Sequence, residues 1–565
     1  MKDEKIEPRS AKLLKGAAVL ALAAIVTKLL GTLQKIPLQN IGGDGVFGIY
    51  NTVYPFYMII ITLATAGFPT AVSKFIAERQ VLGTEAGKRA VLRMASLIMG
   101  LLGAAGFALL YFGAPLLSRA IGSSQLIPAL QNAAPALLFI PLSAAFRGYF
   151  QGLQEMIPTA VSQVTEQAVR VAVMIILLVY LTGLGAADDV IAGGAFAGSA
   201  AGGAAGLIVM VIYWINGTRG RGRAASDRRL NDTLNSDESE SVGVSNRGES
   251  AHREKGTKLL LSMLAYAIPV CLAALAVPLI SLVDTFTLPR LLQSRGADEL
   301  QAMVEVGIYN RGVPLVQLVT MLASSLSVLF IPALTELRMK NDREGIQRQT
   351  MLALRWFWLI GLAASVGLAL LARPINVMLY EDATGSATLA WIAWTAAPGA
   401  LVTVSAALLQ GLGHVRAPAL HLLAAAALKT ALNALLVPPL GITGAAIAGI
   451  AAYGTAAALN LALLSRRTGR AQRGARTALA LLRPVAAVLA MACAVLLVRL
   501  GVGALPLGGG RMAALAESLL GVAVGTAVFA AAVLRTGLLS AAELAALPRV
   551  SPRLVAALHR LRLLR

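Results

Sequence analysis

The sequence predicts an all-α polytopic membrane protein. Of its 565 residues, 57% are hydrophobic and only 14% are charged, and the mean hydropathy is +0.72. Soluble globular proteins contain about 45–50% apolar and about 25% charged residues. The chain also carries repeated apolar runs of about 20 residues or more, and each run is long enough to cross about 30 Å of hydrocarbon as a helix.

Fourteen apolar runs predict fourteen transmembrane helices. The first run follows a basic start but is too long for the apolar region of a signal peptide and contains Lys28, so we expect it to be retained. The runs lie at about 13–36, 46–73, 89–112, 127–147, 158–182, 190–215, 259–288, 304–333, 351–374, 386–411, 417–438, 441–465, 477–500 and 513–537.

Polar segments divide these helices into domains. Residues 216–258 combine many charges with almost no large apolar side chains, a composition that predicts a disordered linker. The expected domains are a six-helix bundle (1–215), the linker (216–258), a second six-helix bundle (259–465), helices 13 and 14 (466–538) and a basic tail (539–565).

The distribution of basic residues predicts the orientation. With the N-terminus in the cytoplasm, most of the 49 lysines and arginines lie on the cytoplasmic side, in clusters such as "KRAVLR" (88–93) and "RRTGRAQRGAR" (466–476). The linker, the tail and both termini are then cytoplasmic. The net charge of +21 does not indicate nucleic-acid binding, because these clusters lack interleaved aromatic residues.

An internal repeat relates the two predicted bundles. The tetrapeptide "GIYN" occurs at 48–51 and again at 307–310, and the "QGL" of "FQGLQEMIP" (150–158) recurs at the same spacing of 259 in "LQGLGHVRAP" (409–418). Six helices return the chain to its starting side, so the repeats are parallel. Duplications of this kind place a transporter's substrate between two bundles.

Four segments carry a resemblance to a known family. "TKLLGTLQKIPL", "AGFPTAVSKFIAE", "FRGYFQGLQEMIPTAVSQVTEQAVRV" and "GIYNRGVPLVQLVTMLASSLSVLFIPALTE" resemble the stage V sporulation protein B and polysaccharide-biosynthesis branch of the multidrug/oligosaccharidyl-lipid/polysaccharide exporter superfamily. This resemblance implies a flippase that moves undecaprenyl-diphosphate-linked sugars, such as a lipid II-like peptidoglycan precursor, to the outer leaflet of the bacterial plasma membrane. It implies membrane lipids and cell-envelope synthesis enzymes as partners.

Charged residues inside the predicted helices are candidate site residues, because charges at membrane depth are costly. Lys28 and Lys35 lie two helical turns apart, and Arg311 follows the second "GIYN". Cations of this kind match a diphosphate. The resemblance implies a cationic cavity with basic residues on helices 1, 2 and 8, which Lys28 and Arg311 match. Helix 2 lacks the arginine of the better-known Gram-negative pattern, and Lys35 is a candidate replacement.

Each candidate also has a structural interpretation. Lys28 and Lys35 can snorkel to the headgroups, and Glu166 and Arg170, four residues apart, can form an internal ion pair. Asp284 can pair with a cavity cation such as Arg311 or Lys28, or bind a coupling cation. Lys429 and Asn433, also four residues apart, fit structural bridging as well as substrate contact. The candidate cavity or ion-coupling residues are Asp284, Glu166, Arg170, Lys429 and Asn433.

No metal ligand set, cofactor motif or nucleophile–base arrangement is visible in the sequence, which argues against an enzyme. The alternative to a flippase is a cation-coupled multidrug exporter of the same superfamily. An exporter of cationic aromatic drugs would favour acidic and aromatic cavity residues. The predicted helices contain more basic than acidic residues and the chain is only 5% aromatic, so an anionic substrate is favoured.

Overall fold

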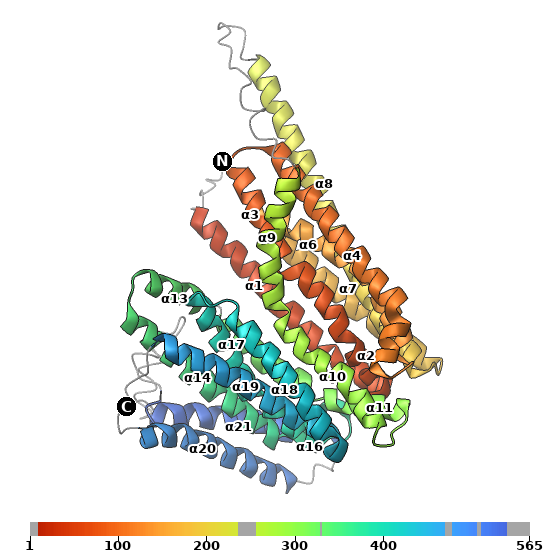
Figure 1. The fold of residues 1–565 in the computed structure, drawn as a ribbon, viewed down its shortest axis with the longest axis vertical. Helices are drawn as coiled ribbons and strands as arrows, with labels where there is room; N and C mark the ends of the chain where they lie inside the picture. Colours follow the sequence, from red (N-terminus) through yellow and green to blue (C-terminus); the bar gives the residue numbers. More distant parts are fainter. Residues whose placement is uncertain (1–8, 235–255, 328–329, 469–476, 505–509, 539–565) are drawn as a thin grey trace. The chain divides into compact units, whose positions relative to one another are not determined.

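The chain is described here by a computed structural model that covers residues 9–234, 256–327, 330–468, 477–504 and 510–538. Within these residues every regular element is a helix (Figure 1). The chain divides into two compact units. Unit 1 comprises Met1–Gly42 and Val53–Pro278, and unit 2 comprises Gly43–Thr52 and Leu279–Arg565. Unit 1 therefore includes residues 259–278 of the predicted second bundle, and unit 2 includes residues 43–52 of the predicted first bundle.

Unit 1 contains eight helices and both ends of α2 (Lys35–Ala66), whose middle, residues 43–52, belongs to unit 2. A break in α2 at Gly43, whose φ of 79° and ψ of 178° are accessible almost only to glycine, coincides with the boundary between the units. The helices are α1 (Arg9–Leu33), α3 (Phe68–Val81), α4 (Glu85–Ile121), α5 (Leu126–Ala133), α6 (Ala136–Gly152), α7 (Met156–Gly183), α8 (Asp188–Leu234) and α9 (Gly256–Ala274).

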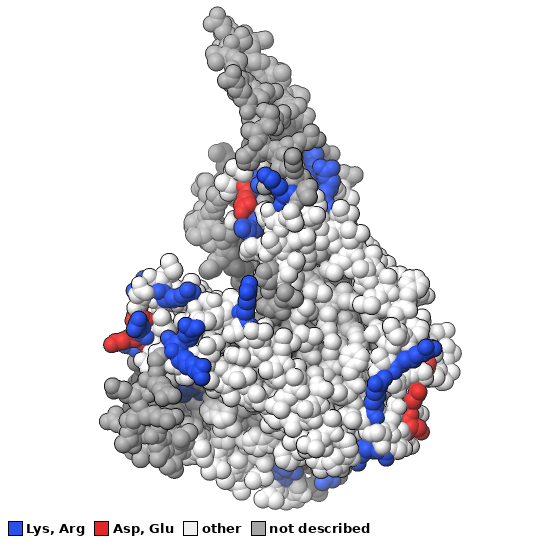
Figure 2. Space-filling view, viewed as in Figure 1, with Lys and Arg blue, Asp and Glu red and all other residues white. Residues whose placement is uncertain are grey.

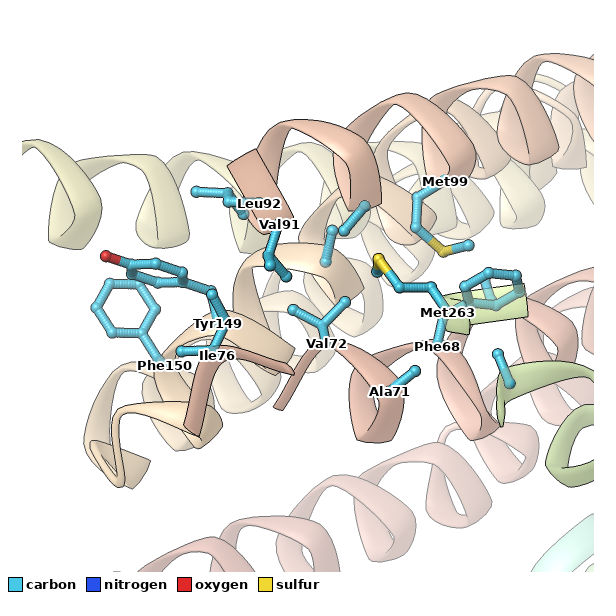
Figure 3. Packing of buried hydrophobic residues seen from close by; sticks show 14 of the residues in the cluster. Phe68, Ala71, Val72, Ile76, Val91, Leu92, Met99, Tyr149, Phe150 and Met263 are labelled. Atoms are coloured by element: carbon cyan, nitrogen blue, oxygen red, sulfur yellow. The ribbon is translucent and has the colours of Figure 1, made fainter. Parts of the chain in front are cut away.

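A packed cluster of buried residues forms around α3 because this helix places apolar residues on one face (Figure 3). Phe68, Val72 and Ile76 recur every four residues and pack with buried residues of α4, α6 and α9. The approach of α6 is close, because a Cβ on Gly148 would lie 2.7 Å from the carbonyl oxygen of Pro69. Helix α9 thus belongs to the core of unit 1.

Unit 2 is built from the segment Gly43–Thr52 and the helices from α10 onward. These helices are α10 (Ala276–Gln293), α11 (Glu299–Asn310), α12 (Val313–Ser327), α13 (Phe330–Met339), α14 (Arg343–Leu370), α15 (Ala372–Tyr380), α16 (Ser386–Ala393), α17 (Ala396–Gly411), α18 (Ala417–Leu440), α19 (Ile442–Thr468), α20 (Thr477–Gly503) and α21 (Arg511–Arg535).

The helices α20 and α21 lie side by side and pack on α14 and α15 (Figure 1). Arg499 of α20 donates to Glu517 of α21 at 2.6 Å and to the carbonyl oxygen of Leu370 at 2.8 Å. Because Leu370 ends α14, this arginine satisfies a helix-terminal carbonyl group while it joins three helices. The C-terminal helix pair is therefore an integral part of unit 2.

The two copies of "GIYN" cross each other inside unit 2. A Cβ on Gly48 would lie 1.8 Å from the carbonyl oxygen of Met303, and a Cβ on Gly307 would lie 2.0 Å from the carbonyl oxygen of Asp44. Only glycine fits at either position. The contacts are also reciprocal, because Met303 stands at the same spacing of 259 from Asp44 as Gly307 does from Gly48.

Twelve helices within the described residues are long and apolar enough to span a membrane. The count is lower than the predicted fourteen because the first two predicted helices fall in one continuous run, Ala18–Val81. The helix predicted at 259–288 contributes only a shorter apolar helix, Lys258–Ile268. In the space-filling view, most of the described surface is uncharged and lysine and arginine form a few patches (Figure 2). An apolar surface of this kind suits a lipid environment.

The helix α8 is longer than the sequence pattern indicates. It continues to Leu234, so the first part of the predicted disordered linker (216–258) is helical. Alanine, arginine and leucine in "RGRAASDRRLNDTL" have high helix propensities, which the composition argument did not weigh. Residues 235–255, and the basic tail predicted at 539–565, lie outside the described residues.

Candidate functional site

A buried group of charges joins α6 and α7 in unit 1. Glu166 accepts from Arg147 at 2.6 Å through one carboxylate oxygen and from Arg170 at 3.0 Å through the other. Arg147 also donates to Ser162 at 2.8 Å, and Ser162 donates to the carbonyl oxygen of Gly206 at 2.9 Å. All three charged side chains are largely buried. The group carries two positive charges and one negative charge.

Glycines of α8 allow this group to form. A Cβ on Gly198 would lie 2.6 Å from the carbonyl oxygen of Arg170, and a Cβ on Gly202 would lie 2.5 Å from that of Glu166. Glycine at Gly206 completes a four-residue spacing that lets the backbone of α8 lie directly on α7. In this closely packed region, Arg147 and Arg170 both pair with the carboxylate of Glu166.

Two tyrosines lie between this group and Lys35. The Lys35 ammonium lies 5.2 Å from the ring centroid of Tyr54, and the Arg170 guanidinium carbon lies 5.7 Å from that of Tyr57. The two rings are 6.1 Å apart. Both distances from cation to ring are typical of cation–π contacts. Lys35 is 4% exposed, so it does not snorkel to the surface of unit 1.

Lys28 lies on α1 and is exposed in the structure. Gln34, the residue between α1 and α2, keeps right-handed helical dihedral angles (φ −58°, ψ −23°), so the chain from Lys28 to Lys35 follows a nearly continuous helix. Gln34 also accepts a hydrogen bond from Gln167 of α7 at 3.4 Å. The end of α1 is thereby joined to the helix that carries Glu166 and Arg170.

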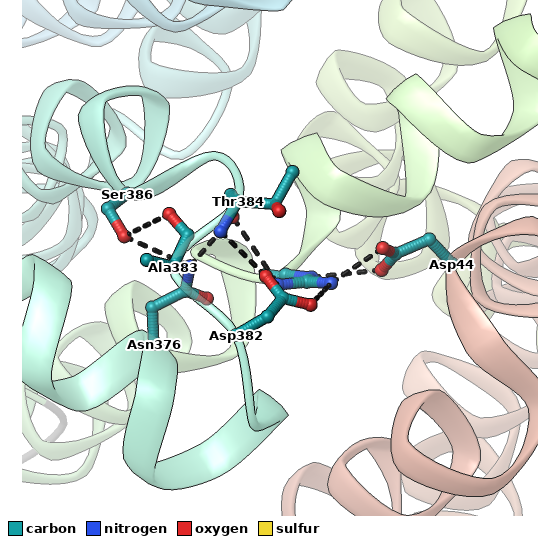
Figure 4. Close-up of polar contacts among 7 residues, drawn as sticks. Asp44, Asn376, Asp382, Ala383, Thr384 and Ser386 are labelled. Atoms are coloured by element: carbon teal, nitrogen blue, oxygen red, sulfur yellow. Dashed lines mark hydrogen bonds and ion pairs between the residues drawn. The ribbon is translucent and has the colours of Figure 1, made fainter. Parts of the chain in front are cut away.

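Arg311 is held in unit 2 between the carboxylates of Asp44 and Asp382, which are labelled in Figure 4. Its Nε and one terminal nitrogen donate to Asp44 at 2.9 and 2.5 Å, and both terminal nitrogens donate to Asp382 at 2.8 and 2.9 Å. The guanidinium also lies 5.4 Å from the ring centroid of Tyr380. Arg311 is 1% exposed, whereas the Asp382 side chain is 48% exposed. The group has a net charge of −1.

The loop after α15 shapes this arginine site. Asn376 donates to the carbonyl oxygen of Thr384 at 2.7 Å, and the Thr384 amide donates to Asp382 at 2.6 Å. The hydrogen bond from Arg311 lowers the pKa of Asp382 below its ordinary value. The Tyr380 hydroxyl donates to the carbonyl oxygen of Arg311 at 3.0 Å, and burial raises the pKa of this phenol. Asp382 is therefore held in its ionised form.

A second buried carboxylate of unit 2 lies among three helices. Asp284 of α10 accepts from Lys429 at 2.5 Å and Asn433 at 3.1 Å, both on α18, and from the Tyr309 hydroxyl at 3.2 Å. Asn433 also donates to Thr287 at 2.8 Å. Lys429 and Asn433 are four residues apart and so share the helix face that meets Asp284.

The structure brings together some predicted residues and separates others. Glu166 and Arg170 form the predicted ion pair, and Lys429 and Asn433 bridge the helices α10 and α18. Asp284 pairs with Lys429 and not with Arg311 or Lys28, the two partners that the sequence offered, and Arg311 pairs with two other carboxylates. A helix carrying two donors toward Asp284 supplies a nearer partner than Arg311.

Sequence reasoning missed Arg147, Asp44 and Asp382 as site residues. Arg147 lies within "PLSAAFRGYFQG", where apolar residues flank it at helical spacing. This pattern could have identified Arg147 as a charge inside a membrane helix. Asp44 and Asp382 stand 267 and 71 positions from Arg311, so only the tertiary fold pairs them. The described residues contain no group of three or more His, Cys, Asp and Glu side chains placed to hold a metal ion. Of the three charged groups described, only the one around Glu166 in unit 1 carries a net positive charge.

Comparisons with known proteins identify relatives of the whole chain. A family model described as "Polysaccharide biosynthesis protein" matches residues 13–338. The uncharacterized membrane protein YabM of Bacillus subtilis (strain 168) is 34% identical over 97% of this chain and 97% of that protein. The lipid II flippase MurJ of the same organism is 27% identical over 81% of this chain and 84% of that protein.

Two solved structures share the fold. An inward-facing multidrug resistance MATE family transporter of the MOP superfamily matches with a TM-score of 0.62 and 16% identity, over 80% of this chain and 98% of that chain. Lipid II flippase MurJ in an inward closed conformation matches with a TM-score of 0.61 and 13% identity, over 90% and 98%. At these identities the likeness establishes the fold alone.

Proposed function

The chain belongs to the polysaccharide biosynthesis protein family, and from this premise we propose that it moves an undecaprenyl-diphosphate-linked sugar from the inner to the outer leaflet. A lipid II-like peptidoglycan precursor or another cell-envelope unit is the proposed cargo. The relationship to the lipid II flippase supports a lipid-linked substrate. The proposed orientation has both termini in the cytoplasm, as the distribution of basic residues predicts.

The cations of unit 1 carry the proposal. Around the Tyr54 and Tyr57 rings, the described part of this unit places Lys35, Arg147 and Arg170 with Glu166. Excess positive charge in a low-dielectric interior attracts an anion much more strongly than it would in water. A diphosphate carries the complementary charge, and lysine and arginine are the side chains suited to it. Lys35, with Lys28 two turns earlier, is the proposed diphosphate contact.

Arg311 has a conditional place in this proposal. Its guanidinium already makes bidentate contacts with Asp44 and Asp382. A phosphate would have to replace one carboxylate, and Asp382 is the candidate to leave because its side chain is 48% exposed, compared with 15% for Asp44. The planar guanidinium of arginine donates two parallel hydrogen bonds to a phosphate in the same bidentate geometry. Arg311 would then contact the cargo only after Asp382, and the loop that carries it, had moved away.

The proposed transport cycle uses two parallel six-helix repeats. The contacts of Gly48 with Met303 and of Gly307 with Asp44 support this arrangement. The two glycines are 259 positions apart, and so are the two residues that they contact. Arg170 and Lys429 are also 259 positions apart and each pairs with a buried carboxylate. Parallel repeats are suited to rocking around a central substrate site.

A cation-coupled multidrug exporter is the competing function, because the fold is shared with a multidrug transporter. The fold therefore does not separate the two functions, and the charges do. A cationic drug would be repelled by the net positive group of Lys35, Arg147, Arg170 and Glu166 in unit 1. The charge of this group favours an anionic cargo.

The test is binding and flipping of a fluorescent polyprenyl-diphosphate sugar by purified protein in liposomes. We expect Lys35→Ala to weaken binding tenfold or more, since a charged hydrogen bond contributes about 1.5–3 kcal/mol. Lys28→Ala should weaken it as well. Lys340→Ala is the matched control, because this lysine is 66% exposed and paired with Glu336. Wild-type flipping by both Lys35→Ala and Lys28→Ala would show that these lysines do not hold the diphosphate.

A further inference from the structure

The feature that leads further is the carboxylate of Asp284, which the proposed transport of an anion leaves without a role. It is buried in unit 2, with its side chain 18% exposed, and Lys429 beside it is 4% exposed. Every contact that the structure gives its oxygens is a donor: the Lys429 ammonium, the Asn433 amide nitrogen and the Tyr309 hydroxyl. Each carboxylate oxygen thus accepts at least one hydrogen bond from the chain itself.

The pair of Asp284 and Lys429 is electrically neutral. Burying one charge alone costs several kcal/mol, and breaking a buried pair costs about 3–5 kcal/mol. A dissolved cation that entered the site would have to displace the ammonium and leave Lys429 buried without its carboxylate. Binding of such a cation is therefore opposed as long as Lys429 is present.

The surroundings would nevertheless suit a cation if the ammonium were removed. Asp284, Tyr309 and Thr287 supply oxygen atoms, and Asn433 has a buried Oδ1 without a hydrogen-bond partner although the residue is fully buried. Hard monovalent and divalent cations prefer oxygen ligands of this kind. An unsatisfied buried acceptor is rare enough to require an explanation. It is one more oxygen atom, on the side chain whose Nδ2 contacts Asp284, and Lys429 does not satisfy it.

We propose that Lys429 is the resident cation of the Asp284 site, so that this site needs no metal ion from solution, and that removal of its ammonium opens a site for a small alkali cation. The proposal excludes an alkali cation as the ion that Asp284 binds in the wild-type protein. It does not depend on the identity of the transported lipid.

The experiment measures the thermal unfolding midpoint of the purified full-length protein in NaCl, LiCl, KCl and choline chloride at equal ionic strength. The wild type should unfold at the same temperature in all four salts. Lys429→Ala should unfold earlier in choline, and sodium or lithium should raise its midpoint by about 2–4 °C or more. Lys340→Ala is the control, because this exposed lysine lies outside the site, and it should behave as the wild type in every salt.

A second set of variants keeps the proposal testable if Lys429→Ala does not fold. Asp284→Asn and Lys429→Met should each lower the midpoint in choline, and the double variant should recover most of the loss because neither charge remains. The double variant should show no response to sodium. A selective rise of the wild-type midpoint in sodium or lithium would overturn the proposal. So would a Lys429→Ala variant that folds and unfolds at one temperature in all four salts.

Discussion

Arg311, Glu166 and Asp284 are buried charges, and each has oppositely charged partners within hydrogen-bond distance. Such pairs rarely stabilise a protein more than apolar packing would, but removing one partner is strongly destabilising. The cost of each charge is therefore largely offset by its partners. Arg311 is therefore compensated by the chain itself before any anion binds.

The two carboxylates of Arg311 should respond differently to substitution. Asp44→Asn should lower the free energy of unfolding by up to about 3–5 kcal/mol, because it removes half of the compensation of a buried guanidinium. Asp382→Asn should cost about 0–1 kcal/mol, since that side chain is half exposed and screened. Thermal unfolding of the purified variants measures both effects. Equal losses would show that exposure does not determine the contribution of each carboxylate.

The Arg311–Asp382 pair also predicts a dependence on pH. The pKa of Asp382 is lower in the folded protein than its ordinary value of about 4, so the stabilisation is fully present above that value. It is lost as the pH falls through the lower pKa of the folded state. The difference in unfolding midpoint between the wild type and Asp382→Asn should therefore shrink below about pH 4. A difference that stays constant from pH 6 to pH 3 would contradict this assignment.

Local spacing predicted some of these partners and not others. Glu166 and Arg170 are four residues apart on one helix, which is sufficient to expect their contact. Arg147 joins them from another helix, and Asp44 reaches Arg311 across 267 positions of sequence. No periodicity encodes such contacts, because they depend on how helices are arranged in space.

Among the helices, the crossing of the two "GIYN" copies has the strictest packing requirement. Gly48→Ala and Gly307→Ala would each place a methyl group within about 2 Å of a backbone oxygen, which no side-chain movement can relieve. Each substitution should cost at least about 1–3 kcal/mol as the helices move apart.

Gly454→Ala in α19 is the matched control, because nothing lies within 4 Å of the added Cβ. It should be neutral or slightly stabilising, since alanine has the higher helix propensity. The thermal unfolding midpoints of the three variants provide the comparison. If Gly48→Ala were as stable as Gly454→Ala, the close crossing would be wrong.

Hydropathy predicted most membrane helices and failed at their junctions. It located the apolar runs of the helices α4, α7 and α18–α21 to within several residues at most ends, because these runs are bounded by polar segments. It did not predict that Gly43 breaks α2 or that Gly256–Ala274 packs in unit 1 while Gly43–Thr52 belongs to unit 2. Those assignments depend on which helix faces fit together. Hydropathy does not distinguish the faces, because all of them are similarly apolar.

For the whole molecule, the family and the fold are established by sequence and structural similarity, and the cargo is the remaining proposal. The fold is shared by a lipid II flippase and a multidrug transporter, which handle different molecules. Fold therefore does not decide the substrate, and the charges of the site must do so. Two arginines share one carboxylate at Glu166, one lysine meets one carboxylate at Asp284, and Arg311 meets two, so the group with excess positive charge is the one in unit 1.

The most direct test of the anionic cargo uses the wild-type protein in liposomes. Flipping of a fluorescent polyprenyl-diphosphate sugar is measured beside transport of a cationic aromatic dye, with protein-free liposomes as the control. The account predicts rapid movement of the diphosphate lipid, inhibition by an excess of unlabelled diphosphate lipid, and no transport of the dye. Transport of the dye without movement of the diphosphate lipid would contradict it and establish the multidrug exporter instead.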